Sequence, residues 1–500
     1  PSVIGQDGDN IYVVRYESSK KPLISAYKTN NLRSTKSAPL IIEYKGKKLD
    51  FIEGYIINNQ PILATKFYNK KGKVVYFFAH KVDENLKVGP PILVGSVPFF
   101  GGGISFSYSS RGNTVSTEDI FNVSADGQNV FGLFNQSSKG SPSKDYKSVL
   151  LDQNLDKIAD ATVSLPYLPE NFVTLKQELG NDGRLYILGY NTIKGKSSGI
   201  IKREEIFRDH IWLYAVDTEN GEIEKVEIET SVDVEQMSLK VSENGNIFIG
   251  ALTSTAESGM NGSMCIIYDN ALNELNRTIT PFESDFIKTT YTEKQLKKQE
   301  KKERKANSKG KAAPTTSFYN YDMRHIVESK DGSFTVFAEQ YYVIVTSTTT
   351  TNSNGTTTTS YTYHYYYNDI IAVRYNRDGQ YIWKNVIEKR QHSINDFGFY
   401  SSFFPIVDGN DIGVIFNTKE IENLDEDELS RSEKKAASRK TICMNVTLTN
   451  DGGIDKEELF SFDEGEKLQI APKYSSQTAS GDVVIFAKSR KGSKIGVIQL

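Results

Sequence analysis

Glu243-Asn244-Gly245-Asn246-Ile247-Phe248-Ile249-Gly250-Ala251-Leu252 is a turn followed directly by an apolar run. An Asn-Gly pair favours a tight hairpin turn, and a short run of β-branched and aromatic residues favours a strand. Units of this kind recur at residues 8–16, 58–67, 125–134, 181–190, 243–252, 330–339, 409–418 and 480–489. A unit that returns along the whole chain indicates a repeat architecture.

Further apolar runs complete each unit. A second run follows the first and ends in a turn, as at residues 264–268, and flanking runs such as 223–228 and 234–241 supply two more strands. Antiparallel units of four strands, repeated around a ring, make a β-propeller. We therefore predict an all-β fold of seven or eight blades, with eight preferred, in one domain over residues 1–500. We expect the two ends of the chain to close the ring in one shared blade.

Composition narrows the class of partner. The chain has 500 residues and a net charge of -3, which excludes a generally basic nucleic-acid binder. No apolar run approaches the ~20 residues of a membrane helix, so we expect no direct membrane insertion. The sequence opens at Pro1 rather than Met, and we expect export with a cleaved signal peptide.

Long connections break the regular repeat. They lie at residues 191–210, 253–263, 283–317, 341–367 and 419–440. All but 283–317 join the second and third strands of a unit, whereas 283–317 joins two units. With strands that alternate in direction, these connections all leave from one face, which we call the decorated face. Loops on a rigid scaffold carry function, so we place the function there.

A basic helix is predicted within the connection at residues 283–317. Residues 293–311 carry nine basic and three acidic side chains, and helix stop signals follow at Asn307, Gly310 and Pro314. One interpretation is an electrostatic contact with an acidic protein, a polyanion or an anionic membrane surface. The other is a solvated helix with no target. Candidate binding residues are Lys297, Lys298, Lys301, Lys302, Arg304 and Lys305.

Residues 341–367 predict one long β-hairpin that reverses near Asn352-Ser353-Asn354-Gly355. Arms of about eleven residues at ~3.3 Å each would extend well past a blade. Because an isolated two-stranded ribbon is marginal in water, a loop or a partner should lie against it. A flexible Thr-rich loop and glycan attachment stay open as alternatives. The candidate anchors for a partner are Tyr361, Tyr363, Tyr365, Tyr366 and Tyr367.

Two other polar segments have open interpretations. Residues 419–440 begin acidic and end basic, which suits a helical excursion with dipole-matched ends, or a charged surface with no role. Residues 384–402 are dense in polar groups, which could bind a ligand at an inner blade end or form a hydrogen-bonded linker between blades. The polar groups in question are Gln391, Ser393, Asn395, Asp396 and Ser401.

No catalytic signature emerges. We expect the five histidines to stand in five different units, which gives no support to a zinc site, and there is no Gly-x-Ser-x-Gly elbow. Cys265 and Cys443 sit inside apolar runs and are expected to be buried thiols. We therefore predict no enzymatic activity, no cofactor and no metal.

Residues 368–402 carry a sequence pattern that resembles one in a known group. The run Asn368-Asp369-Ile370-Ile371-Ala372-Val373, the segment Asp378-Gly379-Gln380-Tyr381-Ile382-Trp383 and the stretch Lys389-Arg390-Gln391-His392-Ser393 resemble propeller-like envelope and secreted proteins of the Bacteroidota. In size and style the chain also resembles the large subunit that closes the periplasmic end of the type 9 secretion translocon. That resemblance implies a periplasmic, non-enzymatic plug that docks on an outer-membrane complex.

Two classes of function follow. The first is a scaffold in the cell envelope that binds a partner protein through the decorated face, with the basic helix and the hairpin as contacts. The alternative is a carbohydrate-binding or carbohydrate-cleaving propeller that uses carboxylates and aromatic side chains of its central channel. A third possibility, binding of a polyanion by the basic helix alone, predicts strongly salt-dependent affinity.

Overall fold

A computed structural model describes residues 2–18, 21–29, 34–98, 119–124, 128–136, 143–165, 171–196, 204–255, 259–311, 315–419, 440–462, 469–478, 481–489 and 492–498. Their regular secondary structure is nearly all strand, in antiparallel sheets that follow one another along the chain. The four-stranded antiparallel repeat predicted from the sequence is confirmed. Among the residues described, no helix is long and apolar enough to cross a membrane.

The sheets are numbered here in chain order. Sheets 1 to 4 contain β1 (Ser2–Asp7), β2 (Asn10–Ser18), β3 (Lys21–Lys28) and β4 (Ser34–Pro39); β7 (Asp50–Ile57), β8 (Gln60–Asn69), β9 (Val74–Lys81) and β10 (Ile92–Pro98); β11 (Asp119–Val123), β12 (Asn129–Asn135), β13 (Lys144–Asp152) and β14 (Lys157–Leu165); and β15 (Phe172–Leu179), β16 (Arg184–Lys196), β17 (Glu204–Asp217) and β18 (Ile223–Glu227). Strands β5 (Glu43–Tyr44) and β6 (Lys47–Lys48) form a separate short pair.

The second half of the chain forms four more antiparallel sheets. Sheets 5 to 8 contain β19 (Asp233–Val241), β20 (Ile247–Ser254), β21 (Met260–Tyr268) and β22 (Glu274–Pro281); β23 (Tyr321–Glu328), β24 (Phe334–Thr351), β25 (Thr357–Tyr375), β26 (Tyr381–Ile387) and β27 (Gln391–Ile394); β28 (Phe404–Asp408), β29 (Asp411–Lys419), β30 (Thr441–Leu448) and β31 (Ile454–Phe462); and β32 (Gln469–Ile470), β33 (Ser476–Gln477), β34 (Val483–Ser489) and β35 (Gly492–Ile498). Within the described ranges, the helices are α1 (Ser284–Lys288), α2 (Glu293–Asn307) and a 3-10 turn (Pro472–Tyr474).

Residues 243–252 show why each repeat forms a turn followed by a buried strand. Gly245 has a φ of +89°, which closes the turn, and the Asn244 side chain accepts a hydrogen bond from the backbone of Asn246. Every residue of β20 is buried, because its alternate side chains enter two different cores. Ile249 packs with sheet 4, whereas Phe248 packs with sheet 6.

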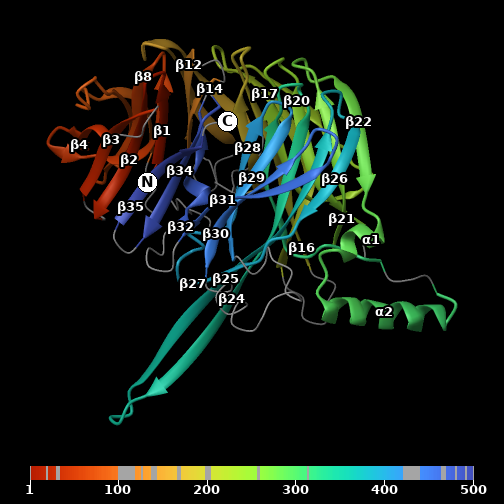
Figure 1. Cartoon of the computed structure of the whole chain (residues 1–500). Coiled ribbons are helices and arrows are strands. Elements are labelled where there is room, and N and C mark those ends of the chain that lie inside the picture. The colour runs from red at the N-terminus through yellow and green to blue at the C-terminus, as the bar shows by residue number, and fades with distance from the viewer. Residues whose placement is uncertain are drawn as a thin grey trace.

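The same packing joins all the described sheets in series. A hydrophobic cluster lies between each sheet and the next, and first strands of neighbouring sheets, such as β15 and β19, contact one another. A further cluster joins the last sheet to the first, with Val484 and Phe486 against Ile11 and Val13. The arrangement is propeller-like (Figure 1).

The expectation of a shared closing blade is wrong for the described strands. Strands β1 to β4 form one sheet, and β35 pairs with β34 in another. The two ends therefore meet through side-chain packing instead of a common hydrogen-bond ladder. Apolar faces on both terminal sheets make this possible, because burial of those faces needs no added strand.

Parts of the predicted long connections lie within the described residues. Strands β16 and β17 continue as a hairpin into the segment predicted at residues 191–210. Figure 1 shows α2 and the extended part of β24 and β25 leaving the same end of the sheets. The helical excursion predicted at residues 419–440 lies outside the described residues, except for the two ends of that range.

Candidate functional site

The most prominent feature of the decorated face is a two-stranded ribbon, defined here as residues 341–367. Strands β24 and β25 pair without a register shift from Tyr341 opposite Tyr367 to Thr351 opposite Thr357. At the tip, Asn352 donates its backbone N–H to the Thr356 carbonyl over 3.0 Å. The ribbon extends well beyond the sheets (Figure 1).

The ribbon carries no Asp, Glu, Lys or Arg side chain. Near its base, large apolar groups are open to solvent: Ile344 is 47 % exposed, Val345 50 % and Tyr361 61 %. Toward the tip, threonine hydroxyls form cross-strand contacts, with 3.1 Å between the Oγ1 atoms of Thr349 and Thr359. Exposed apolar side chains next to one another are typical of a surface that binds something.

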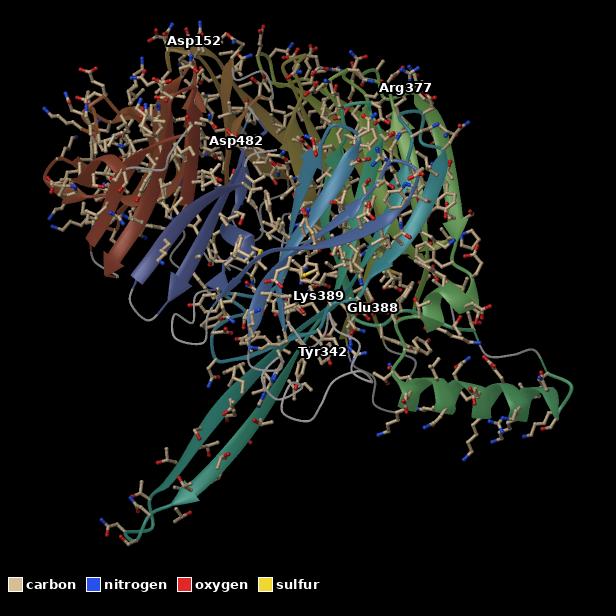
Figure 2. The ribbon with its side chains drawn as sticks, viewed as in Figure 1. Asp152, Tyr342, Arg377, Glu388, Lys389 and Asp482 are labelled. Atoms are coloured by element: carbon tan, nitrogen blue, oxygen red, sulfur yellow. The ribbon has the colours of Figure 1, made fainter. Side chains whose placement is uncertain are left out.

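A buried ion pair fixes the base of the ribbon. Lys389 Nζ lies 2.8 Å from Glu339 Oε1, and both side chains are fully buried. The ammonium also donates to the Tyr367 carbonyl and to Gln391 Oε1, each over 3.0 Å. These three acceptors match the three protons of an ammonium. Burial lowers the pKa of Lys389, and the Glu339 carboxylate opposes that shift. Figure 2 shows Lys389 at the end of the sheets where the ribbon begins.

The second oxygen of Glu339 is also satisfied. Ser402 Oγ donates to Glu339 Oε2 over 2.8 Å, and Arg324 Nε donates to the same oxygen over 3.1 Å. Burial alone would raise the pKa of the Glu339 carboxyl, but the charges of Lys389 and Arg324 outweigh burial and lower it. The carboxylate is therefore ionised within the fold. Arg324, Glu339, Lys389, Gln391 and Ser402 are called the anchor network below.

The anchor network reaches across three sheets. Gln391 Nε2 donates to the Asn417 carbonyl over 2.7 Å, and Gln391 Oε1 accepts from the Ser402 backbone over 2.7 Å. Asn417 in turn donates to the Ile470 carbonyl of sheet 8 over 2.7 Å. These hydrogen bonds connect the base of the ribbon, in sheet 6, to sheets 7 and 8. They restrict the movement of the ribbon relative to those two sheets.

Aromatic packing surrounds the network. Tyr341, Tyr365 and Tyr367 form a buried cluster, and the Arg324 guanidinium lies 5.0 Å from the Tyr341 ring centre. Gly398, with a φ of +62°, packs on Tyr367 so closely that an added Cβ would lie 2.4 Å from Tyr367 Cε2. Only glycine combines this backbone conformation with that approach.

A short strand covers part of one ribbon edge. Strand β27 pairs with residues 364–367 of β25, and Asn395 continues the contact with hydrogen bonds to the backbone of Tyr363. His364 Nδ1 and His392 Nε2 are 3.2 Å apart across this pairing. The expectation that the five histidines stand in five different units is therefore wrong, because His325, His364 and His392 all lie in sheet 6. Of the polar groups predicted at residues 384–402, Gln391, Asn395 and Asp396 form side-chain hydrogen bonds within the chain, as a linker would. Ser393 Oγ is buried without a hydrogen-bond partner among the described residues.

Helix α2 is attached more lightly. Thr292 caps its N-terminus in a capping box with Gln295, Gln299 is buried, and Glu303 Oε1 lies 3.1 Å from Lys288 Nζ. The remaining acidic groups pair along the helix, Glu293 with Lys297 and Glu300 with Arg304, at solvent-exposed positions. Since residues 293–311 hold nine basic groups and three acidic ones, the helix presents a positive surface.

The predicted binding residues divide into two groups. Lys297, Lys298, Lys301, Lys302, Arg304 and Lys305 are all exposed on α2. Tyr361 and Tyr363 are exposed on the ribbon and Tyr366 is half-buried, whereas Tyr365 and Tyr367 are buried at its base. The last two support the ribbon from inside. Exposed Ile344, Val345 and Phe397 were not among the predicted residues, although their apolar character next to the tyrosines pointed to them.

The anchor network was also missed. Gln391 was among the candidate polar groups, and Lys389 belongs to the stretch that resembles the Bacteroidota pattern, but Glu339 and Lys389 stand 50 positions apart in the chain and no local signal pairs them. Within the described residues, no three His, Cys, Asp or Glu side chains lie close enough to hold a metal ion. Cys265 and Cys443 are buried free thiols, as predicted.

The chain is similar to known proteins in structure but not in sequence. No family model matches the chain, and no curated protein matches its sequence. Prolyl oligopeptidase B from Galerina marginata is similar in structure, with 7 % identity over 98 % of this chain and 55 % of that protein, at a TM-score of 0.43. The chain thus spans about half the length of that enzyme.

Two further structures are similar along most of their length. An uncharacterized protein from Listeria monocytogenes matches with 8 % identity over 91 % of this chain and 96 % of its own, at a TM-score of 0.38. The β-propeller domain of the Trilobed protease from Pyrococcus furiosus, described as having an open velcro topology, matches with 8 % identity over 93 % and 97 %, at a TM-score of 0.34.

Proposed function

We propose that the chain is an eight-bladed β-propeller that binds a partner protein through its decorated face and has no catalytic activity of its own. The series of sheets and of clusters between them supports the ring. Each described sheet from 1 to 8 shares a core with its successor, and sheet 8 shares one with sheet 1.

The observation that carries the binding role is the anchored ribbon. A surface loop without function would gain nothing from a fully buried, charged base such as the pair of Glu339 and Lys389, because burial of two ions is costly. Here the charges hold in place a ribbon with exposed apolar groups such as Val345 and Tyr361. A rigid element that presents such groups loses little entropy when a partner binds.

Helix α2 would supply the electrostatic part of the contact. Its exposed lysines would attract an acidic partner surface and accelerate the encounter, while the apolar side chains of the ribbon would provide most of the affinity. Following the resemblance at residues 368–402, the protein would act in the periplasm. The partner would then be a subunit of an outer-membrane complex, with closure of a secretion translocon as the specific role.

Mild extraction of the tagged protein from its native envelope tests this function. Mass spectrometry would identify what co-purifies with the full chain, with a variant whose ribbon lacks residues 346–360, and with a variant reversed in charge at Lys297, Lys298, Lys301 and Lys302. We expect a membrane-complex protein to co-purify with the full chain in stoichiometric amount and to be lost from the variant with the trimmed ribbon. The charge-reversed variant should retain this partner to an extent that depends on the salt concentration. A full chain that purifies alone, or a partner that survives both changes, would contradict the proposal.

A further inference from the structure

The outer edge of β24 is a row of unused backbone groups. Tyr341 donates its N–H over 2.7 Å to the Asn320 carbonyl, away from β25, whereas Asn352 donates toward the β25 side. Since the direction alternates along a regular strand, the N–H groups of Val343, Val345 and Ser347 also point away from β25. Among the described residues, no strand pairs with this edge beyond Tyr341.

This edge lacks the usual protection. Natural proteins guard exposed edge strands with charged side chains, proline or bulges. Residues 341–351 contain neither a charged residue nor proline, and their pairing with β25 shows no register shift. The anchor network holds the strand in place from its base. The result is a preformed template for another strand.

The opposite edge of the ribbon already accepts a strand. β27 adds to β25 in antiparallel register, from Gln391 opposite Tyr367 to Ile394 opposite His364. An extended segment of only four residues is thus enough to pair with this ribbon within the chain. The β24 edge offers the same backbone groups over a longer run.

A second copy of the chain fits the edge poorly. Full antiparallel pairing of two β24 ribbon segments would place Val343 of one copy opposite Thr349 of the other and would not match apolar with apolar side chains. A partner strand that is apolar near the base and rich in hydroxyls near the tip avoids this mismatch. The basic surface of α2, on the same face, favours acidic residues in that partner near the base.

We propose that the β24 edge from Val343 to Thr351 binds an extended, uncharged segment of an acidic partner protein by strand addition. This inference rests on the proposed function and specifies how the ribbon would act. The added strand would accept hydrogen bonds from Val343, Val345 and Ser347. Its side chains would lie beside Ile344 and Val345 on the two faces of the ribbon.

A peptide with the sequence of residues 357–367, followed by four glutamates, is a suitable probe because β25 already pairs with β24. Amide exchange of the full-length protein, with and without this peptide, reports on each edge separately. We expect the amides of Val343, Val345 and Ser347 to exchange quickly in the free protein and to gain protection with the peptide. The amides of Tyr342 and Ile344, which face β25, should be protected in both.

Two variants isolate the edge. Val345→Pro removes one outward N–H without removing a hydrogen bond to β25, and should weaken peptide binding by about tenfold. Val345→Thr keeps the N–H and should bind as the parent does. Continued protection of Tyr342 and Ile344 in the Val345→Pro protein would show that its ribbon remains formed.

Three results would overturn the inference. One is peptide addition that leaves the outward amides unprotected, and another is equal binding by the Pro and Thr variants. The third is protection that rises with concentration of the free protein, which would assign the edge to a second copy. If the trimmed ribbon loses its envelope partner while the outward amides stay unprotected, strand addition fails and the docking function stands.

Discussion

The ribbon and helix α2 leave the same face but are held in opposite ways. The ribbon has no charged side chain beyond its base, yet that base contains the fully buried pair of Glu339 and Lys389. The helix carries its charge on the outside and touches the body through few groups, among them Gln299 and the pair of Glu303 with Lys288. Buried charge fixes an element in position, whereas exposed charge mainly acts at a distance.

The largest expected effect comes from breaking the anchor network. Glu339→Leu would leave Lys389 and Arg324 buried without their carboxylate and should lower the free energy of unfolding by about 3–5 kcal/mol. Urea denaturation of the full chain would measure it. Adding Lys389→Met should recover part of the loss, and Glu293→Gln on α2 should have no measurable effect. An undiminished denaturation midpoint for Glu339→Leu would contradict the role given to the network.

A smaller loss is expected from Gly398→Ala. Both the φ of +62° and the 2.4 Å approach of a Cβ to Tyr367 oppose it, and we expect about 1–3 kcal/mol of destabilisation. Gly355→Ala at the ribbon tip is a matched control, since its φ is +76° but no heavy atom lies within 4 Å of the added Cβ. Thermal unfolding of both variants would isolate the contact with Tyr367. Equal shifts would show that this contact carries no stability.

Acid should loosen the ribbon through Glu339. Although burial raises the pKa of this carboxyl, the charges of Lys389 and Arg324 bring it below its unfolded value of about 4.3. Stability from this group is therefore present above about pH 4.3 and is lost as the pH falls through the folded value. Amide exchange at Tyr342 between pH 6 and pH 3 would follow the change. The Glu339→Gln protein should lack this step, and an identical pH profile in both proteins would rule out Glu339 as its source.

The smallest effect is expected at the attachment of α2. Lys288 and Glu303 remain partly exposed, so Glu303→Gln should cost about 0.5 kcal/mol or less. Amide exchange along α2 should accelerate slightly, while the ribbon amides stay unchanged. A change that spread to the amides of Tyr342 or Ile344 would mean that α2 and the ribbon are coupled, and would contradict their independent attachment.

Local signals in the sequence accounted for the repeat and for both projecting elements. The pair Asn244-Gly245 favours a turn through its own backbone preference. The ribbon was predicted as a hairpin because Asn352 and Gly355 stand between uncharged, strand-forming arms. The capping box at Thr292 and Gln295 is equally local. Features of this kind depend on residues that are near one another in the chain.

Long-range features could not be read in the same way. The pairing of Glu339 with Lys389 depends on how β24 and the segment before β27 meet in space. Burial of Tyr365 and Tyr367, in contrast to Tyr361 and Tyr363, depends on how far along the ribbon the body reaches, which no local pattern records. Closure by packing, with Val484 near Ile11, likewise depends on the ring as a whole.

We infer that the ribbon is a rigid, preformed element and that α2 is loosely attached. Amide exchange of the free full-length protein at neutral pH tests it most directly. We predict that the Tyr342 and Ile344 amides exchange as slowly as those of the buried strand β20, and that the amides of α2 exchange much faster. A ribbon that exchanges as fast as α2 would contradict the claim.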